Sequence, residues 1–121
     1  MSVQILNACD GLMTLRFEGK LSHTELVKAQ DEAAAIFRQQ GQMNVLVLAD
    51  TFAGWEKEGD WGDISFQLEN DQYMKKIAIV GGKEWELLTL IFVGKGVRRT
   101  PVEFFPTEEL AKARVWLAHT P

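Results

Sequence analysis

The residues of this sequence that could do chemistry are few and widely separated. A cysteine nucleophile needs a neighbouring base to form its thiolate. The chain has one cysteine, Cys9, and two histidines, His23 and His119, which lie far apart and in helical contexts. We therefore interpret Cys9 as a small strand residue and His23 as a solvated side chain, with no cysteine or carboxylate beside it at metal-ligand spacing.

Two further patterns resemble catalytic motifs without completing one. The glycines of Gly81-Gly82-Lys83 lack P-loop spacing and are followed by Glu84-Trp85, so we expect no nucleotide site. Several carboxylates cluster after the central strand, but no base, nucleophile or metal set accompanies them. The sequence therefore predicts a protein that is not an enzyme and has no cofactor or metal. The carboxylates are Asp50, Glu56, Glu58, Asp60 and Asp63.

Composition and net charge limit the classes of protein to which this chain could belong. The chain has 121 residues, of which 46% are hydrophobic and 25% charged, and this predicts a single domain over 1–121 with its own core. A net charge of −4 offers no basic surface for nucleic acid. A single cysteine and an N-terminus without a signal-like apolar run lead us to expect a cytoplasmic protein.

The first elements carry strong local signals. Residues 3–8 and 12–18 are strand-like runs, and Asp10-Gly11 between them predicts an antiparallel hairpin. Ser22 and Glu25 form a capping-box pattern at the start of a helix that Gly41 should end.

Short apolar runs further along predict buried parallel strands. Residues 44–50 contain an unbroken apolar run, rich in Val and Leu and ended by a carboxylate. We take them as the central strand, with a turn over 50–55. Residues 77–82 repeat the pattern, and 102–105 predict an edge strand between two prolines. A last helix follows from 107. Ligand sites of such sheets lie beyond the carboxyl ends of the strands, which places the expected site near the turn over 50–55.

Two of the expected helices have apolar residues on more than one side. In a helix over 61–73 the spacing directs Trp61, Ile64 and Leu68 to the core and Phe66 and Tyr73 to the other side. The second side could be a lid or interface, or these could be scattered surface aromatics.

A helix over 84–93 would be apolar nearly all round, although it is far too short to span a bilayer. Its outer side must meet a ligand, a second subunit or a membrane, unless it is simply wedged between neighbours. Basic residues around it would suit an anionic lipid surface, and would equally suit a solvated loop. They are Lys83, Lys95, Arg98 and Arg99.

Three local runs carry a family resemblance. They are Asp50 with Phe52 and Gly54-Trp55, then 76–81 with Trp85, and then Phe104-Phe105-Pro106 with Ala113 and Trp116-Leu117. Together with the element order, they resemble the SpoIIAA-like family, whose fold is related to STAS domains and to CRAL-TRIO lipid-binding proteins. The resemblance implies an α/β fold with the order ββαβαβαβα. Its mixed, mainly parallel five-stranded sheet would have an N-terminal hairpin and four helices. The resemblance also implies no catalytic machinery and an apolar pocket beneath movable helices.

The turn after the central strand departs from one branch of that fold. Anti-sigma-factor antagonists carry a phosphorylated serine there, whereas this chain has Thr51 as the only hydroxyl of 50–54. Thr51 is therefore a candidate phosphosite, with a local turn hydrogen bond as the alternative. Phe52 and Trp55 favour apolar packing over kinase recognition.

We expect one of two functions. The first is non-enzymatic binding of a small apolar or lipid-like ligand between the sheet and helices 61–73 and 84–93, in a protein peripheral to the inner face of the membrane. The second is a regulatory, STAS-like interaction module that docks a protein partner or a second copy through 50–55, a homodimer being its simplest form. The ligand-binding residues expected under the first are Phe52, Trp55, Trp61, Phe66, Trp85, Leu88, Ile91 and Phe92.

Overall fold

A five-stranded sheet organises the chain. The computed structural model describes residues 2–61, 65–92, 98 and 100–119. Within them the sheet runs in the order β1-β2-β3-β4-β5, with β1 antiparallel to β2 and the other pairs parallel. This confirms the expected α/β class and mixed sheet. The strands are β1 Val3–Cys9, β2 Leu12–Leu21, β3 Met43–Trp55, β4 Met74–Gly81 and β5 Val102–Pro106.

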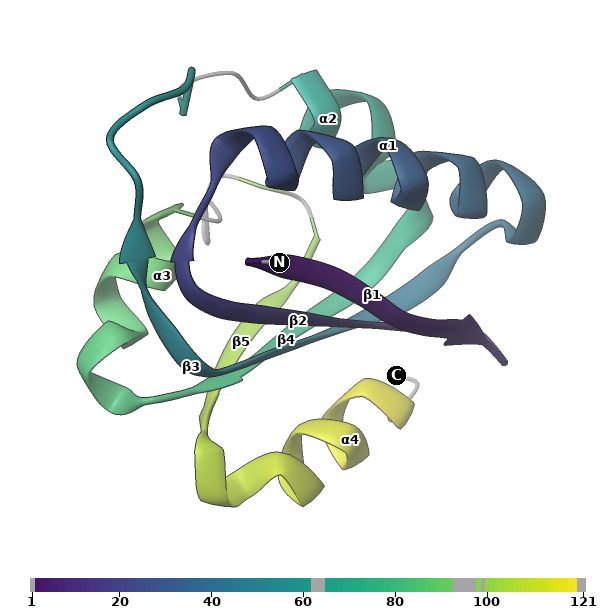
Figure 1. The fold of residues 1–121 in the computed structure, drawn as a ribbon. Coiled ribbons are helices and arrows are strands. Elements are labelled where there is room, and N and C mark those ends of the chain that lie inside the picture. Colours follow the sequence, from purple (N-terminus) through teal and green to yellow (C-terminus); the bar gives the residue numbers. More distant parts are fainter. Residues whose placement is uncertain (1, 62–64, 93–97, 99, 120–121) are drawn as a thin grey trace.

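Helices cover both faces of the sheet (Figure 1). The helices α1 (His23–Gln40) and α2 (Ser65–Asn70) lie over one face, and α4 (Leu110–Ala118) lies over the other. The helix α3 (Glu86–Phe92) follows β4 and lies at the end of the sheet. Because the central strand β3 is covered on both faces, Val45 packs in the core on the α1 side and Leu46 in the core on the α4 side. This is why residues 45–49 of this strand are continuously apolar.

The hairpin forms as its sequence predicts. Asp10 and Gly11 have φ angles of 54° and 78°, and Cys9 pairs with Leu12 across them. Positive φ at both central residues is the type I′ geometry, whose twist matches that of the flanking strands.

The central strand is longer than predicted, and the expected turn over 50–55 is wrong. The strand β3 passes the point where Ala49 pairs with Gly81 of β4 and continues along β2, where Gly19 pairs with Phe52 and Leu21 with Trp55. The glycine that suggested a turn has another role. Gly54 has a φ of 105°, and a Cβ built there would lie 3.2 Å from Cη2 of Trp85.

One of the two hydrogen bonds of the predicted capping box forms at the start of α1. Ser22 Oγ accepts a hydrogen bond from the Glu25 N–H at 3.3 Å, as an N-cap should. However, the Glu25 carboxylate accepts from the N–H and the hydroxyl of Ser2, at 2.8 and 2.5 Å. The Ser22 N–H donates to Ser2 Oγ at 3.0 Å. Ser2 thus takes the place that Ser22 has in a standard box.

This arrangement predicts a pH dependence of stability. The hydrogen bonds from Ser2 hold the pKa of Glu25 below its ordinary value of 4.5. A lowered pKa means that the ionised carboxylate stabilises the fold above about pH 4.5, and that this contribution is lost as the pH falls through the folded-state pKa. We expect the free energy of unfolding of Glu25→Gln, from urea denaturation, to fall less between about pH 5 and pH 3 than that of the wild type. Glu32→Gln, an exposed change on the same helix, should retain the wild-type slope. Equal slopes in all three proteins would contradict the assignment.

Candidate functional site

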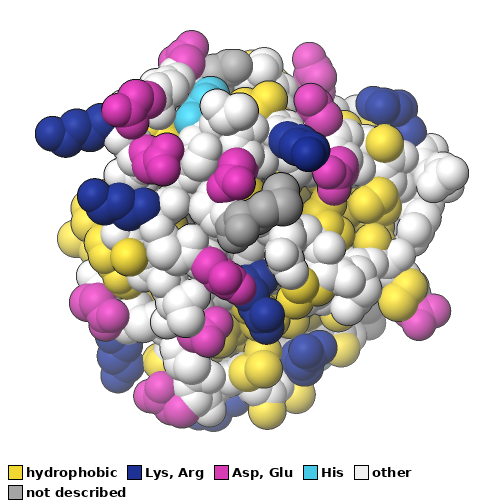
Figure 2. Space-filling model, viewed as in Figure 1, with side chains coloured by type: hydrophobic (Ala, Val, Ile, Leu, Met, Phe, Trp, Pro, Cys, Tyr) yellow, Lys and Arg dark blue, Asp and Glu magenta, His cyan; other side chains and the backbone are white. Residues whose placement is uncertain are grey.

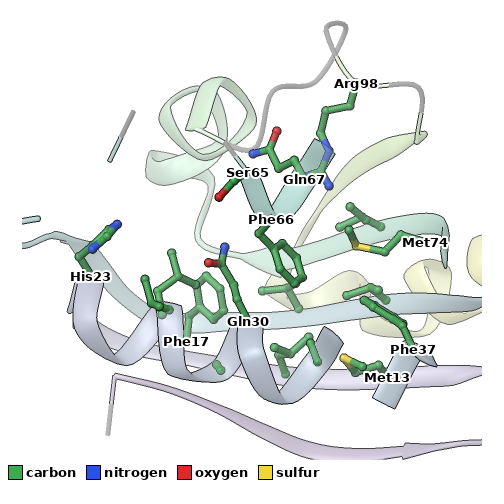
Figure 3. Close-up of a pocket in the computed structure, with 18 of the residues that line it drawn as sticks. Met13, Phe17, His23, Gln30, Phe37, Ser65, Phe66, Gln67, Met74 and Arg98 are labelled. Atoms are coloured by element: carbon green, nitrogen blue, oxygen red, sulfur yellow. The ribbon is translucent and has the colours of Figure 1, made fainter. Parts of the chain in front are cut away.

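A cavity of about 190 Å³ lies between α1, α2 and the sheet (Figure 3). Its floor is formed by strands β2, β3 and β4, one wall by α1, and the other by α2. The apolar lining residues are Met13, Leu15, Phe17, Leu26, Val27, Ala29, Ala33, Phe37, Val45, Val47, Trp61, Phe66, Met74 and Ile77. The polar ones are His23, Gln30, Asp60, Ser65, Gln67 and Arg98.

The sequence periods explain how these side chains meet. On β3, Val45 and Val47 are two residues apart and therefore face the same side of the sheet. On α1, Ala29, Ala33 and Phe37 recur every four residues and form one stripe toward the sheet. Two of the three are alanine, and such short side chains leave space between helix and sheet.

Aromatic side chains border the cavity on the α2 side. Phe66 points from α2 down toward the sheet, between Gln30 and Met74 (Figure 3). The imidazole of His23 contacts Trp61 edge to face, with 4.8 Å between ring centroids. The indole N–H of Trp61 donates to the carbonyl of Glu56 at 2.8 Å, which fixes its ring.

The positive charge at the cavity is compensated. The guanidinium of Arg98 donates two hydrogen bonds to the carboxylate of Asp71, one of them from Nε at 3.0 Å. The Arg98 side chain is only 8% exposed. Because Arg98 was expected on a membrane surface, this placement is a correction: its charge is used inside the protein.

In the segment after the central strand, Trp61 packs on the core as predicted, but Phe66 and Leu68 lie on the opposite sides to those predicted. Phe66 and Tyr73 pack on the core, where Tyr73 stacks on Phe37 at 5.8 Å, whereas Leu68 is 76% exposed. The reason is that α2 ends at Asn70 and a 3-10 turn occupies Asp71–Tyr73, so one helical wheel over 61–73 does not apply. Ile64 lies outside the described residues.

Three of the predicted ligand residues meet each other away from the cavity. Phe52, Trp55 and Trp85 form a cluster with ring centroids 5.1 to 6.3 Å apart. They join the extension of β3 to the 3-10 turn Lys83–Trp85 that precedes α3. Phe52 is buried, and none of the three lines the cavity. Of the predicted ligand residues, Trp61 and Phe66 line it.

The wall formed by α1 was missed by the sequence analysis. Gln30 and Ala33 lie on this wall and Met13 on the floor beneath it, and none was a predicted site residue. The available signal was the pair of alanines at 29 and 33 on the core face of a long helix, since small residues there allow an unfilled space.

Comparison with known families identifies the relationship of most of the chain. The family model described as SpoIIAA-like matches residues 12–118. The chain belongs to the SpoIIAA-like family. It is also similar to a crystal structure of an uncharacterized protein of the DUF3478 family with a SpoIIAA-like fold from Shewanella loihica PV-4. The two share 20% identity over 96% of this chain and 92% of the other, with a TM-score of 0.66. That likeness shows the fold. No curated protein matches the chain.

In this SpoIIAA-like chain, α3 has an exposed apolar side, as the sequence predicted. Leu87, Leu88 and Ile91 are 71%, 50% and 67% exposed, whereas Thr89 is buried and Leu90 packs on the core. Hydrophobic side chains gather at the left edge of the surface in Figure 2, where Figure 1 places α3. Leu88 and Ile91 therefore lie on the outer surface and do not line the cavity. The side chain of Phe92 lies outside the description.

The remaining predicted site residues of the SpoIIAA-like chain lie on the surface or outside the description. Thr51 is exposed on β3, in a strand rather than a turn, and its phosphorylation stays a prediction. Lys83 is exposed beside two acidic residues, Glu84 and Glu86. Lys95 and Arg99 fall outside the described residues.

The described residues include neither a metal-ligand cluster nor a membrane-spanning helix. They contain no group of three His, Cys, Asp or Glu side chains placed to hold a metal ion. None of the helices in the described part of the chain is long and apolar enough to cross a membrane.

Proposed function

We propose that this SpoIIAA-like protein is a non-enzymatic binding protein for a small apolar molecule, held in the cavity between α1, α2 and the sheet. The cavity itself carries the proposal, because it is about 190 Å³ in size and is lined mainly by apolar side chains. An apolar protein cavity of about 150 Å³ is sufficient to bind benzene. Apolar lining with a few polar groups is also the usual composition of a small-molecule site.

This is the class of function that the sequence led us to expect, but the proposed ligand site lies in a different part of the fold. The sequence placed the ligand under helices 61–73 and 84–93, whereas the cavity lies between α1 and α2, with α3 at the end of the sheet. Membrane attachment receives less support, because Arg98 pairs with Asp71.

The methionines provide a test with an internal control. Met13 and Met74 line the cavity, whereas Ala113 is fully buried on the other face of the sheet. We expect titration with ethylbenzene to shift the methyl NMR signals of Met13 and Met74 saturably and to leave the methyl signal of Ala113 nearly unchanged. Equal small shifts of all three signals, or none at saturation with ethylbenzene, would contradict the proposal.

A second candidate function rests on the exposed side of α3. Leu87, Leu88 and Ile91 form an apolar patch that a second copy or a protein partner would cover, as the regulatory interaction module requires. Under this alternative, sedimentation velocity should show a dimer for the wild type and a monomer for Leu87→Ser/Leu88→Ser. Leu68→Ser, an equally exposed change on α2, should leave the dimer intact. A wild-type monomer at high concentration would remove the homodimer form of this alternative.

A further inference from the structure

The polar side chains of the cavity indicate that the ligand also has a polar group. Gln30 comes from the middle of α1, and its amide points away from α1 toward the start of α2 (Figure 3). Among the described residues, no side chain or backbone group forms a hydrogen bond with this amide. An amide facing an apolar space offers both a donor and an acceptor, and a ligand that fills the space without pairing them would leave them unsatisfied.

The charges around the cavity argue against an anionic ligand. Among the lining residues that the structure describes, Arg98 is the cationic side chain, and its guanidinium is bound to Asp71. The other charged residue of this described lining is Asp60, a carboxylate. A carboxylate or phosphate head would therefore have to compete with Asp71 for Arg98 and would lie in the same cavity as Asp60. A neutral polar group on the ligand would neither compete with Asp71 nor be repelled by Asp60.

The volume limits the apolar part of the ligand. At about 190 Å³, the cavity is only moderately larger than one of about 150 Å³ that holds benzene. One aromatic ring with a short substituent fits this space, whereas a long acyl chain would extend well beyond it.

Taking these observations together and resting on the function proposed above, we propose that the cavity selects a compact, uncharged aromatic molecule with one hydrogen-bonding group. Gln30 is the residue that recognises this group. A phenol or a similar small alcohol has this chemistry. Fatty acids and phospholipids do not, because they combine a charged head with a long chain.

Four probes separate size, charge and hydrogen bonding in isothermal titration calorimetry. They are ethylbenzene, para-ethylphenol, para-ethylbenzoate and decanoate. We expect the wild type to bind para-ethylphenol about threefold to tenfold more tightly than ethylbenzene, as one net hydrogen bond would give. We expect para-ethylbenzoate and decanoate to bind more weakly than either.

Changing Gln30 should remove the preference for the hydroxyl group. In Gln30→Leu, the ratio of the two affinities should fall to about one, so that para-ethylphenol binds no more tightly than ethylbenzene. Gln30→Met, close in shape to glutamine, serves as a second variant should the leucine protein fold poorly. Gln39→Leu, an exposed change on the same helix, should keep the full preference.

The outcomes distinguish this inference from the function on which it rests. A phenol preference that Gln30→Leu abolishes and Gln39→Leu retains supports the inference. If ethylbenzene binds without a phenol preference, or the preference survives both Gln30 variants, the inference is overturned and the binding function stands. Tightest binding of para-ethylbenzoate or decanoate overturns the inference also. Binding of none of the four overturns both.

Discussion

Replacing Ala33 with phenylalanine is expected to weaken ligand binding severely while the protein stays folded. Ala33 is 4% exposed on α1 and borders the cavity. A phenyl ring at this position would occupy the space that an aromatic ligand needs, so the affinity for ethylbenzene should fall by about tenfold or more. The ring would enter an existing space, so the melting temperature should change little or rise.

The same helix offers a matched control for this change. Ala35 is exposed, so Ala35→Phe adds the same ring on the solvent side of α1. Calorimetric titration with ethylbenzene should give wild-type affinity for Ala35→Phe and severely weakened binding for Ala33→Phe. If both variants bind like the wild type, the ligand is not held in the cavity.

The second large effect concerns the stability of the cavity wall. Phe37 is 1% exposed, closes one end of the α1 stripe and stacks on Tyr73 with an interplanar angle of 11°. Removing its ring enlarges an existing space and loses the stacking contact, so Phe37→Ala should lower the free energy of unfolding by about 3 to 5 kcal/mol. Urea denaturation followed by circular dichroism measures this difference.

Leu68 provides the comparison for Phe37. At 76% exposed it makes few contacts, so Leu68→Ala should change the free energy of unfolding by less than about 0.5 kcal/mol. The sequence assigned Leu68 to the core stripe of its helix, and equal losses from Phe37→Ala and Leu68→Ala would restore that assignment and contradict the observed packing.

The elements that were predicted correctly are those with local causes. Asp10-Gly11 adopts the positive φ angles that a two-residue hairpin needs, and Ser22 caps α1 through its own side chain. The unbroken apolar run 45–49 is itself a local pattern, typical of a strand that is covered on both faces. Neighbouring residues were sufficient to predict each of these features.

The features that could not be predicted depend on contacts between distant residues. The strand β3 continues to Trp55 because β2 is long enough to pair with it, and Gly54 is needed because Trp85 approaches from a later segment. Ser2 replaces Ser22 as the donor to Glu25 across a separation of 23 residues. The residues next to each position in the sequence do not indicate which distant residues it will contact.

The cavity was half predicted for the same reason. Aromatic residues at 61 and 66 suggested an apolar site and do border it. Its other wall belongs to α1, whose apolar stripe looked like ordinary core, since a sequence pattern shows which face is buried but not whether the buried space is filled.

The central claim is that a small apolar molecule occupies the space between α1, α2 and the sheet, and intermolecular nuclear Overhauser effects test it most directly. With ethylbenzene bound, we predict contacts from its ring protons to the methyl groups of Met13, Met74 and Ala33, which line the cavity. Contacts instead to Leu87, Leu88 or Ile91 would place the molecule on the exposed side of α3. That result would contradict the cavity as the binding site and favour the interaction surface.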